Sequence, residues 1–240
     1  MAESAYVPGT AIQASEVLDT PRHSVLVRIT HWIFAFSFIG LVVSGFGILL
    51  SHPHMYWGET GNILTPSLFD LPLPTMLGGP SGWGRSLHFQ SAWFAILSGL
   101  LYAISGLFTQ HFRHSLLPSR ADLSWPSLRA NILDHLRFKR PTDQDSYNVL
   151  QRLSYLAVVF LIFPLMIITG FAMSPSITSV FPQFVTVFGG QQSARTVHFF
   201  LANFLVLFLF VHIAMVILAG FTIRMRAMTT GRAADNKELP

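Results

Sequence analysis

The sequence predicts an all-α integral membrane protein with a bundle of four transmembrane helices, and three observations predict it. Of the 240 residues, 51% are hydrophobic and 11% are charged, whereas soluble domains carry about 25% charged residues. The 22 Phe residues add apolar surface that needs a large core or lipid to cover it. Four runs without Asp, Glu, Lys or Arg are long enough to cross about 30 Å of hydrocarbon as helices. They cover residues 29–50, 86–109, 153–173 and 196–223.

These runs divide the chain into an N-terminal arm (1–28), a membrane domain (29–223) and a tail (224–240). The arm contains acidic residues and a proline and has no apolar core, so it does not resemble a cleavable signal peptide. Strands of a membrane β-barrel would be about 10 residues long with alternating polarity. Because the four runs are longer and apolar on all sides, the sequence predicts a helical bundle and excludes an ordinary soluble enzyme.

The distribution of basic residues predicts the orientation of the bundle. Thirteen of the 15 Lys and Arg residues lie in the arm, in the loop 110–152 and in the tail. Only Arg85 and Arg195 lie in the other two loops, 51–85 and 174–195. Since loops rich in Lys and Arg stay cytoplasmic, we expect both termini in the cytoplasm of a bacterial cell. The protein then lies in the inner membrane, with the other two loops on the periplasmic face.

Two connecting segments carry features of their own. The long loop 51–85 contains Tyr56 and Trp57, which are typical interfacial anchors, while its length also suits a docking surface for a partner. The segment 119–140 mixes apolar and basic residues. We expect it to form an amphipathic helix on the inner membrane surface, with its charges on lipid headgroups rather than on a partner.

Four histidines fall inside or at the edge of the apolar spans, where an ionisable side chain indicates a functional site. They are His31, His88, His198 and His212. His198 and His212 are 14 residues apart, which places both on nearly the same helix face and separates them by about 21 Å along the axis. This distance is too long for one metal ion and suits two flat cofactors at different depths.

The predicted topology supplies each of these histidines with a partner at the same depth. His31 enters from the cytoplasmic side and lies level with His212, whereas His88 enters from the periplasmic side and lies level with His198. Two imidazoles on opposite faces of a haem leave its iron six-coordinate, which suits electron transfer. The absence of cysteine excludes disulfides, iron–sulfur clusters and c-type haem. The sequence therefore predicts two b-type haems, an outer one at His88 and His198 and an inner one at His31 and His212.

Three of the four histidines follow an Arg-x-x-His pattern. Since residues three apart are neighbours on a helix, each arginine would lie one turn nearer to water, where it could bind a haem carboxylate. The alternative is that arginines gather at membrane boundaries, and it is weaker for the two on the outer side. The arginines are Arg28, Arg85 and Arg195.

Other residues have less distinctive interpretations. Gly45 lies 14 residues after His31 and is expected to let the outer porphyrin approach the backbone, unless it only packs helices together. The third span has no histidine, contains Pro164 as an expected kink, and is interpreted as scaffold. Four histidines in cytoplasmic segments are expected to be solvated, and His52 and His54 are too few to indicate a metal site. The cytoplasmic ones are His23, His111, His114 and His135.

The apolar core, from residue 28 to about 226, resembles the prokaryotic four-helix dihaem b-type cytochromes. These proteins are membrane subunits of nickel–iron hydrogenases, formate dehydrogenases and thiosulfate reductases. The resemblance rests on Arg28-Ile29-Thr30-His31-Trp32, on His88 and on the pair His198 and His212. It implies that these four histidines bind two haems in the same two pairs.

The resemblance also implies that the chain transfers electrons between a periplasmic catalytic subunit, such as a molybdenum enzyme or a hydrogenase, and membrane quinone. The length of the loop 51–85 favours members with such a subunit. One alternative is a self-contained superoxide:quinone oxidoreductase, which would need a basic funnel on the outer face. Another is a colourless transporter that uses the histidines as proton relays. The sequence shows no nucleophile, carboxylate pair or phosphate loop for a catalytic centre within the chain.

Overall fold

The computed structural model describes residues 23–62, 64–74, 81–109, 125, 129 and 149–231. It confirms the predicted all-α bundle, with four helical spans long and apolar enough to cross a membrane. These spans are α2 (Val25–Ser51), α3 (Ser81–Phe108), a composite third span and α10 (Gln191–Leu218). The predicted amphipathic segment 119–140 lies outside the described residues, apart from positions 125 and 129.

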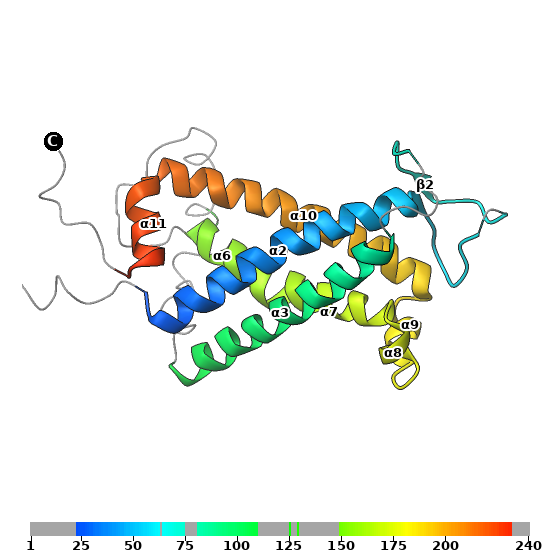
Figure 1. Ribbon diagram of the computed structural model, residues 1–240, viewed down its shortest axis with the longest axis horizontal. Helices are drawn as coiled ribbons and strands as arrows, with labels where there is room; N and C mark the ends of the chain where they lie inside the picture. Colours follow the sequence, from blue (N-terminus) through cyan, green and yellow to red (C-terminus); the bar gives the residue numbers. More distant parts are fainter. Residues whose placement is uncertain are drawn as a thin grey trace, which may run out of the picture.

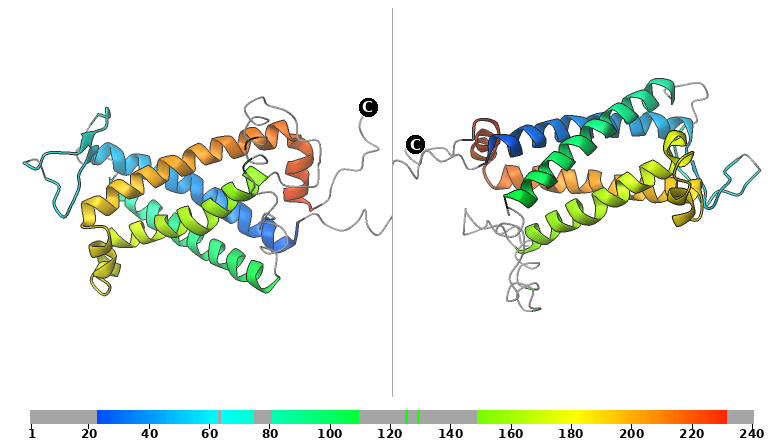
Figure 2. Two further views of the ribbon diagram at one scale, coloured as in Figure 1. Left: turned by 180° about the vertical axis from the view of Figure 1, so that it is seen from behind. Right: turned by 90° about the horizontal axis from the view of Figure 1, so that it is seen from below.

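The four spans lie side by side along the long axis of the molecule (Figure 1). They form two closely packed helix pairs, one of α2 with α3 and the other of α10 with the third span, as Figure 2 shows from two further directions. A small β-hairpin lies at one end of the bundle, and the short helix α11 (Phe221–Thr229) lies across the other. These two ends are called the hairpin end and the α11 end below.

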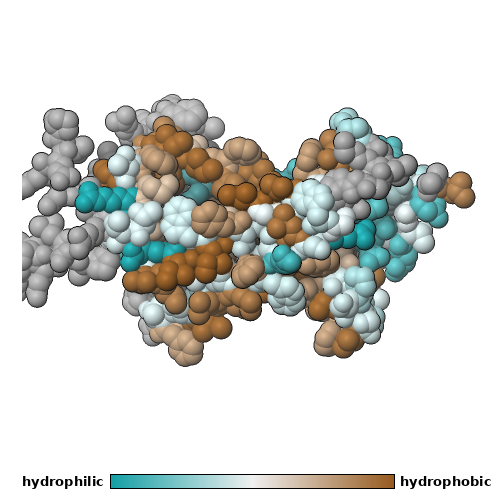
Figure 3. Space-filling view, in the orientation of Figure 1, coloured by the Kyte–Doolittle hydropathy of each residue, from teal (hydrophilic) through white to brown (hydrophobic). Residues whose placement is uncertain are grey.

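The bundle has large apolar side chains on its outside and small residues at its helix contacts. Phe36, Phe94 and Phe210 are each more than 60% exposed, whereas Ser44 and Ala172 are fully buried. Hydrophobic side chains cover much of the visible face along the helices (Figure 3). Small residues at helix contacts with apolar residues outside are typical of bundles surrounded by lipid, as expected for an integral membrane protein.

The fourth span ends earlier than the sequence suggested. Residues 196–223 were expected to form one helix, but α10 ends at Leu218 and α11 begins at Phe221. Gly220 between them has a φ of 93°, a left-handed conformation that glycine adopts readily and that commonly terminates helices. The chain turns there, and α11 runs across the bundle end (Figure 1).

The third span is interrupted beside its proline. It consists of α6 (Val149–Ala157), a π-helical turn (Val158–Ile162) and α7 (Phe163–Ala172). Pro164 has no backbone N–H and cannot donate the helical bond to the preceding turn. The irregular turn thus lies next to the residue that was expected to disrupt this helix.

The loop between α2 and α3 forms a short hairpin. Strand β1 (His54–Met55) pairs with β2 (Phe69–Asp70) in an antiparallel register that sets His54 opposite Asp70. The His54 Nδ1 atom lies 2.7 Å from Asp70 Oδ1. Met55 points inward and is fully buried. The connection at the same end between α7 and α10 contains α8 (Pro175–Thr178) and α9 (Gln183–Val187).

The same loop is held against the beginning of α10 by hydrogen bonds in both directions. Gly58 N–H donates to Ser193 Oγ over 2.7 Å, and Gly58 O accepts from Gln192 N–H over 3.0 Å. Thr196 Oγ1 donates to Tyr56 O over 2.7 Å. The amides of a first helical turn lack partners within their helix, and this loop supplies one. Part of the long loop is therefore a fixed cover over the hairpin end.

Gly190 should be essential to this cover, because it has a φ of 132° and a methyl group there would overlap the carbonyl group of Gly58. We expect Gly190→Ala to lower the free energy of unfolding by about 2–3 kcal/mol. Gly189 also has a positive φ, of 68°, but lies in open space, so Gly189→Ala should cost only about 1 kcal/mol. Thermal unfolding of both variants in detergent checks this, and equal losses would contradict it.

The pairing of His54 with Asp70 predicts a pH dependence of the hairpin. The hydrogen bond from His54 lowers the pKa of Asp70 below its ordinary value of 3.8. Because the lowered pKa belongs to the folded state, the stabilisation is present above 3.8 and is lost as the pH falls through the lowered value. We expect the Leu68 amide, which donates to Met55 O, to lose protection from hydrogen exchange in that range. Asp70→Asn should have weaker protection throughout and no such step.

Candidate functional site

The four intramembrane histidines lie in two pairs, one near each end of the bundle. The ring centres of His88 on α3 and His198 on α10 are 6.2 Å apart. Those of His31 on α2 and His212 on α10 are 6.5 Å apart. The structure therefore brings together the same pairs that the sequence predicted from depth and helix face.

Both separations suit one metal ion held between two imidazoles. A metal lies about 2 Å from an imidazole nitrogen and each nitrogen about 1 Å from its ring centre, so the two ring centres would be about 6 Å apart. Among the described residues, no group of three or more His, Asp or Glu is placed to hold a bare ion. A haem supplies four further nitrogen ligands and needs two axial ones. The residues present therefore fit haem at both pairs.

A serine on α2 fixes the orientation of the His88 ring. Ser44 Oγ lies 3.0 Å from His88 Nδ1 and donates its own proton to Gly40 O over 2.6 Å. The serine must therefore accept from Nδ1–H of the histidine. With the proton on Nδ1, the lone pair of Nε2 is free to bind a metal.

A threonine on α7 does the same for His198. Thr169 Oγ1 lies 2.9 Å from His198 Nδ1 and has two carbonyl acceptors on its own helix, Leu165 O and Met166 O, each at 2.9 Å. Thr169 is fully buried. The third span was interpreted as scaffold because it contains no histidine, but it supplies a direct contact to the site.

Gly45 was expected to let the outer porphyrin approach the helix backbone. In the structure it lies beside the hairpin-end pair, and its neighbour is the ring of His88. A methyl group on Gly45 would lie 3.7 Å from His88 Cε1. Gly170, which the sequence did not single out, stands in the same relation to His198 Cε1, also at 3.7 Å. At both positions the absence of a side chain brings a helix backbone against the edge of an imidazole ring.

The pair at the α11 end has aromatic rather than hydroxyl neighbours. Trp32 meets His31 edge-on at 5.4 Å, and Phe208 stacks with His212 at 6.3 Å. The Nδ1 atom of His31 is buried without a hydrogen-bond partner among the described residues. The two pairs thus differ in the groups that surround them.

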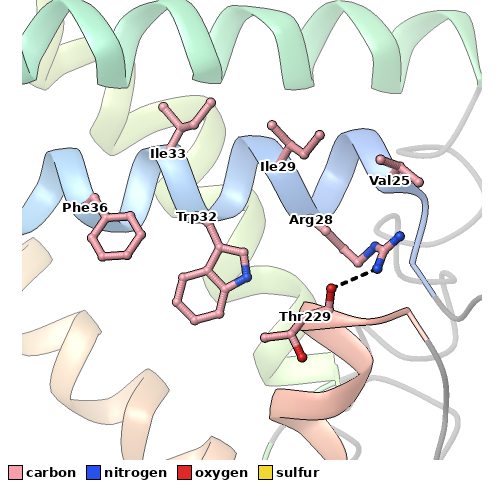
Figure 4. Close-up of a pocket in the computed structure, with 7 residues that line it drawn as sticks. All are labelled: Val25, Arg28, Ile29, Trp32, Ile33, Phe36 and Thr229. Atoms are coloured by element: carbon pink, nitrogen blue, oxygen red, sulfur yellow. Dashed lines mark hydrogen bonds between the residues drawn. The ribbon is translucent and has the colours of Figure 1, made fainter.

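Arg28 connects α2 with α11. Its Nη1 donates to Thr229 O over 2.9 Å (Figure 4), and Trp32 Nε1 donates to Met228 O over 3.1 Å. Both acceptors are carbonyls of the last turn of α11, which have no partner within that helix. The Nε atom of Arg28 is buried and has no partner within the part of the chain that the structure describes. One nitrogen of this guanidinium is therefore available to a further acceptor beyond the described residues.

A groove of about 440 Å³ runs along α2 beside this contact. Its walls are mostly apolar, and several of the lining side chains are exposed on the lipid-facing side of the bundle. It is lined by Val25, Arg28, Ile29, Trp32, Ile33, Phe36 and Thr229 (Figure 4).

The two arginines of the hairpin end meet at His52, which the sequence left without a role. Arg195 donates to the His52 carbonyl, and Arg85 Nη2 lies 3.4 Å from His52 Nε2. Partial burial, followed by the charges of Arg195 and Arg85, lowers the pKa of His52. The sequence places His52 33 residues before Arg85 and 143 before Arg195, so only the folded chain reveals this basic cluster.

Comparison with known proteins supports the resemblance seen in the sequence. The family model of prokaryotic cytochrome b561 matches residues 22–231. An Azospira oryzae protein named as a protein-methionine-sulfoxide reductase subunit is 31% identical over 202 residues, which cover 84% of this chain and 92% of that protein. A Cupriavidus necator protein named as a nickel–iron-hydrogenase B-type cytochrome subunit is 28% identical over 228 residues, covering 88% and 82%.

No solved structure matches the chain. The family match covers all four membrane spans, both histidine pairs and the helix α11. It therefore agrees with a membrane-spanning helical bundle and with haem b as the cofactor. The chain belongs to the prokaryotic cytochrome b561 family of membrane haem b electron-transfer proteins.

Proposed function

We propose that this protein holds two b-type haems, one between His88 and His198 and one between His31 and His212. The observation that carries the proposal is the separation of the two ring pairs, 6.2 and 6.5 Å, near opposite ends of one bundle. Bound haem supplies one-electron redox chemistry, which no side chain here provides. The residues of the chain fix the ring orientation, exclude water and set the charge around each site.

The basic cluster at the hairpin end suits the carboxylates of the haem that is held there. Arg85 and Arg195 each precede a paired histidine by one helical turn, and His52 lies between them. Paired donors on guanidinium bind carboxylate well. At the other end, the unpartnered Nε of Arg28 is the corresponding donor, one turn before His31. The proposal thus gives these arginines the carboxylate-binding role that the Arg-x-x-His pattern suggested.

The proposed orientation places the hairpin end on the periplasmic side of a bacterial inner membrane and both termini in the cytoplasm. It rests on the scarcity of basic residues in the two connections at the hairpin end. These connections also expose large apolar side chains, including Trp57 at 61%, Val180 at 66% and Val187 at 74%. Such side chains suit a docked catalytic redox subunit. The names of both relatives refer to subunits of larger redox enzymes.

The groove beside Arg28 is the proposed place where membrane quinone exchanges electrons with the protein. Its apolar walls suit an isoprenoid quinone, and Ile29 and Phe36 expose 52% and 69% of their surface toward lipid. Arg28 and Trp32 lie in the same groove and belong to the helix turn that carries His31. Quinone would therefore meet the protein at the α11 end, and the catalytic subunit at the hairpin end.

The haem assignment predicts the composition of the purified protein. We expect two b-type haems per chain by a pyridine haemochrome assay. His88→Ala or His198→Ala should remove one, and His31→Ala or His212→Ala the other, because each variant takes an axial ligand from a different site. His54→Ala, which changes an exposed histidine outside both pairs, should keep both haems. One haem in the wild-type protein, or two in His88→Ala, would refute the pairing.

The quinone proposal is tested by a variant that fills the groove. Ile29→Trp should slow haem reduction by decylubiquinol on the order of tenfold, because the added ring displaces the quinol from its position. Val43→Trp is the matched control, since Val43 is on the same helix with a similar exposure, 51% against 52%, and lies outside the groove. Stopped-flow reduction in nanodiscs gives both rates. Equal rates in the two variants would place quinone exchange elsewhere.

A further inference from the structure

Two hydroxyl-glycine dipeptides face the histidine pair of the hairpin end in the same way. Ser44-Gly45 on α2 contacts His88, and Thr169-Gly170 on α7 contacts His198. In each, the hydroxyl oxygen lies 2.9 to 3.0 Å from Nδ1. A methyl group on either glycine would lie 3.7 Å from Cε1 of the same ring. Because α2 and α7 belong to different helix pairs, the repeat is not a consequence of one helix contact.

The proton positions follow from the hydrogen bonds within each helix. Ser44 Oγ lies 2.6 Å from Gly40 O and 3.2 Å from Leu41 O, and Thr169 Oγ1 lies 2.9 Å from Met166 O. Each hydroxyl proton is thereby used within its own helix, so the oxygen can only accept from the imidazole. The hydroxyl beside each Nδ1 thus requires the proton on that nitrogen.

The other pair lacks this arrangement on at least one side. The Nδ1 atom of His31 is buried with no partner among the residues that the structure describes. Its neighbour Trp32 presents a ring edge and directs its own N–H to Met228 O. If every buried imidazole nitrogen needed a hydrogen-bond partner, His31 Nδ1 would have one, as His88 Nδ1 has in Ser44. The hydroxyl at His88 therefore calls for a more specific explanation.

We propose that Ser44 and Thr169 are positioning residues that strengthen His88 and His198 as electron donors and lower the reduction potential of the haem held between them. This inference rests on the proposed haem at that pair. An acceptor on Nδ1–H fixes the ring orientation and raises the basicity of Nε2. Hydrogen bonding around the axial ligands is one of the ways in which a protein sets haem potential.

The direction of the effect follows from charge. Reduction adds one electron to the iron, changing it from ferric to ferrous, and the proton stays on Nδ1. Both hydroxyls accept this proton in either state, but they stabilise the ferric state more, because its ligands carry more positive charge. Removing a hydroxyl therefore favours the reduced state and raises the potential.

Redox titration of the full chain, followed in the haem absorption bands, tests the proposal with Ser44→Ala and Thr169→Val. We expect one of two potentials to rise while the other stays fixed. Since each single variant keeps the hydroxyl beside the other ring, it should shift the ratio of reduced to oxidised haem only about threefold. The double variant should shift it about tenfold, which is 59 mV for a one-electron couple.

Ser37→Ala is the matched control, because Ser37 is buried two turns earlier on α2 and donates to Ile33 O over 2.7 Å in the same way. It should leave both potentials unchanged, and the hydroxyl-retaining Ser44→Thr and Thr169→Ser should resemble the wild type. Unchanged potentials in the double variant, or an equal shift in Ser37→Ala, would overturn the proposal.

Haem content separates this proposal from the haem assignment itself. A wild-type protein without two haems would refute the proposed function, and this inference with it. If Ser44→Ala or Thr169→Val loses one haem while Ser44→Thr and Thr169→Ser keep both, the hydroxyl holds the ligand as proposed. Loss of haem in the hydroxyl-retaining variants as well would show that shape rather than hydrogen bonding matters, and would overturn it.

Discussion

The constraint on which this structure depends is the separation of two imidazole rings across the interior of a membrane bundle. His88 and His198 belong to different helix pairs, so their 6.2 Å spacing depends on how the two helix pairs are placed relative to each other. Ring packing alone would leave the imidazoles free to turn about their side-chain bonds. The contacts from Ser44 and Thr169 remove that freedom, since a buried N–H in an apolar interior is costly to leave without an acceptor.

Much of this arrangement could be predicted from the sequence, because lipid imposes simple rules. A run of about 20 residues without charge has few structures available in hydrocarbon other than a helix. The 14-residue spacing of His198 and His212 then fixes their common face, and the basic residues order the spans. These rules lead, without knowledge of any contact, to the same ring pairs that lie close together in the structure. They do not reveal helix ends inside apolar sequence, and so the break at Gly220 was missed.

The surroundings of the pairs could not be predicted, for a different reason. A threonine in an apolar helix usually bonds its own backbone, and Thr169 does this as well. Only the three-dimensional contact with His198 distinguishes it from other hydroxyls in the spans, and the third span, which contains no histidine, was therefore interpreted as scaffold. His52 presents the same difficulty. Its neighbours Arg85 and Arg195 come from two other elements, and their approach depends on how the loop folds over α10.

The two ends of the bundle are built for different neighbours. At the hairpin end, the loop bonds to the start of α10 through Gly58 and Tyr56, and positive charge gathers at His52. This cover lies over the end of the bundle that holds His88 and His198, and it suits an aqueous or protein neighbour. At the α11 end, aromatic rings surround the histidines, and an apolar groove opens along α2. This asymmetry supports the proposed exchange of electrons with a peripheral subunit at the hairpin end and with a lipid-soluble carrier at the α11 end.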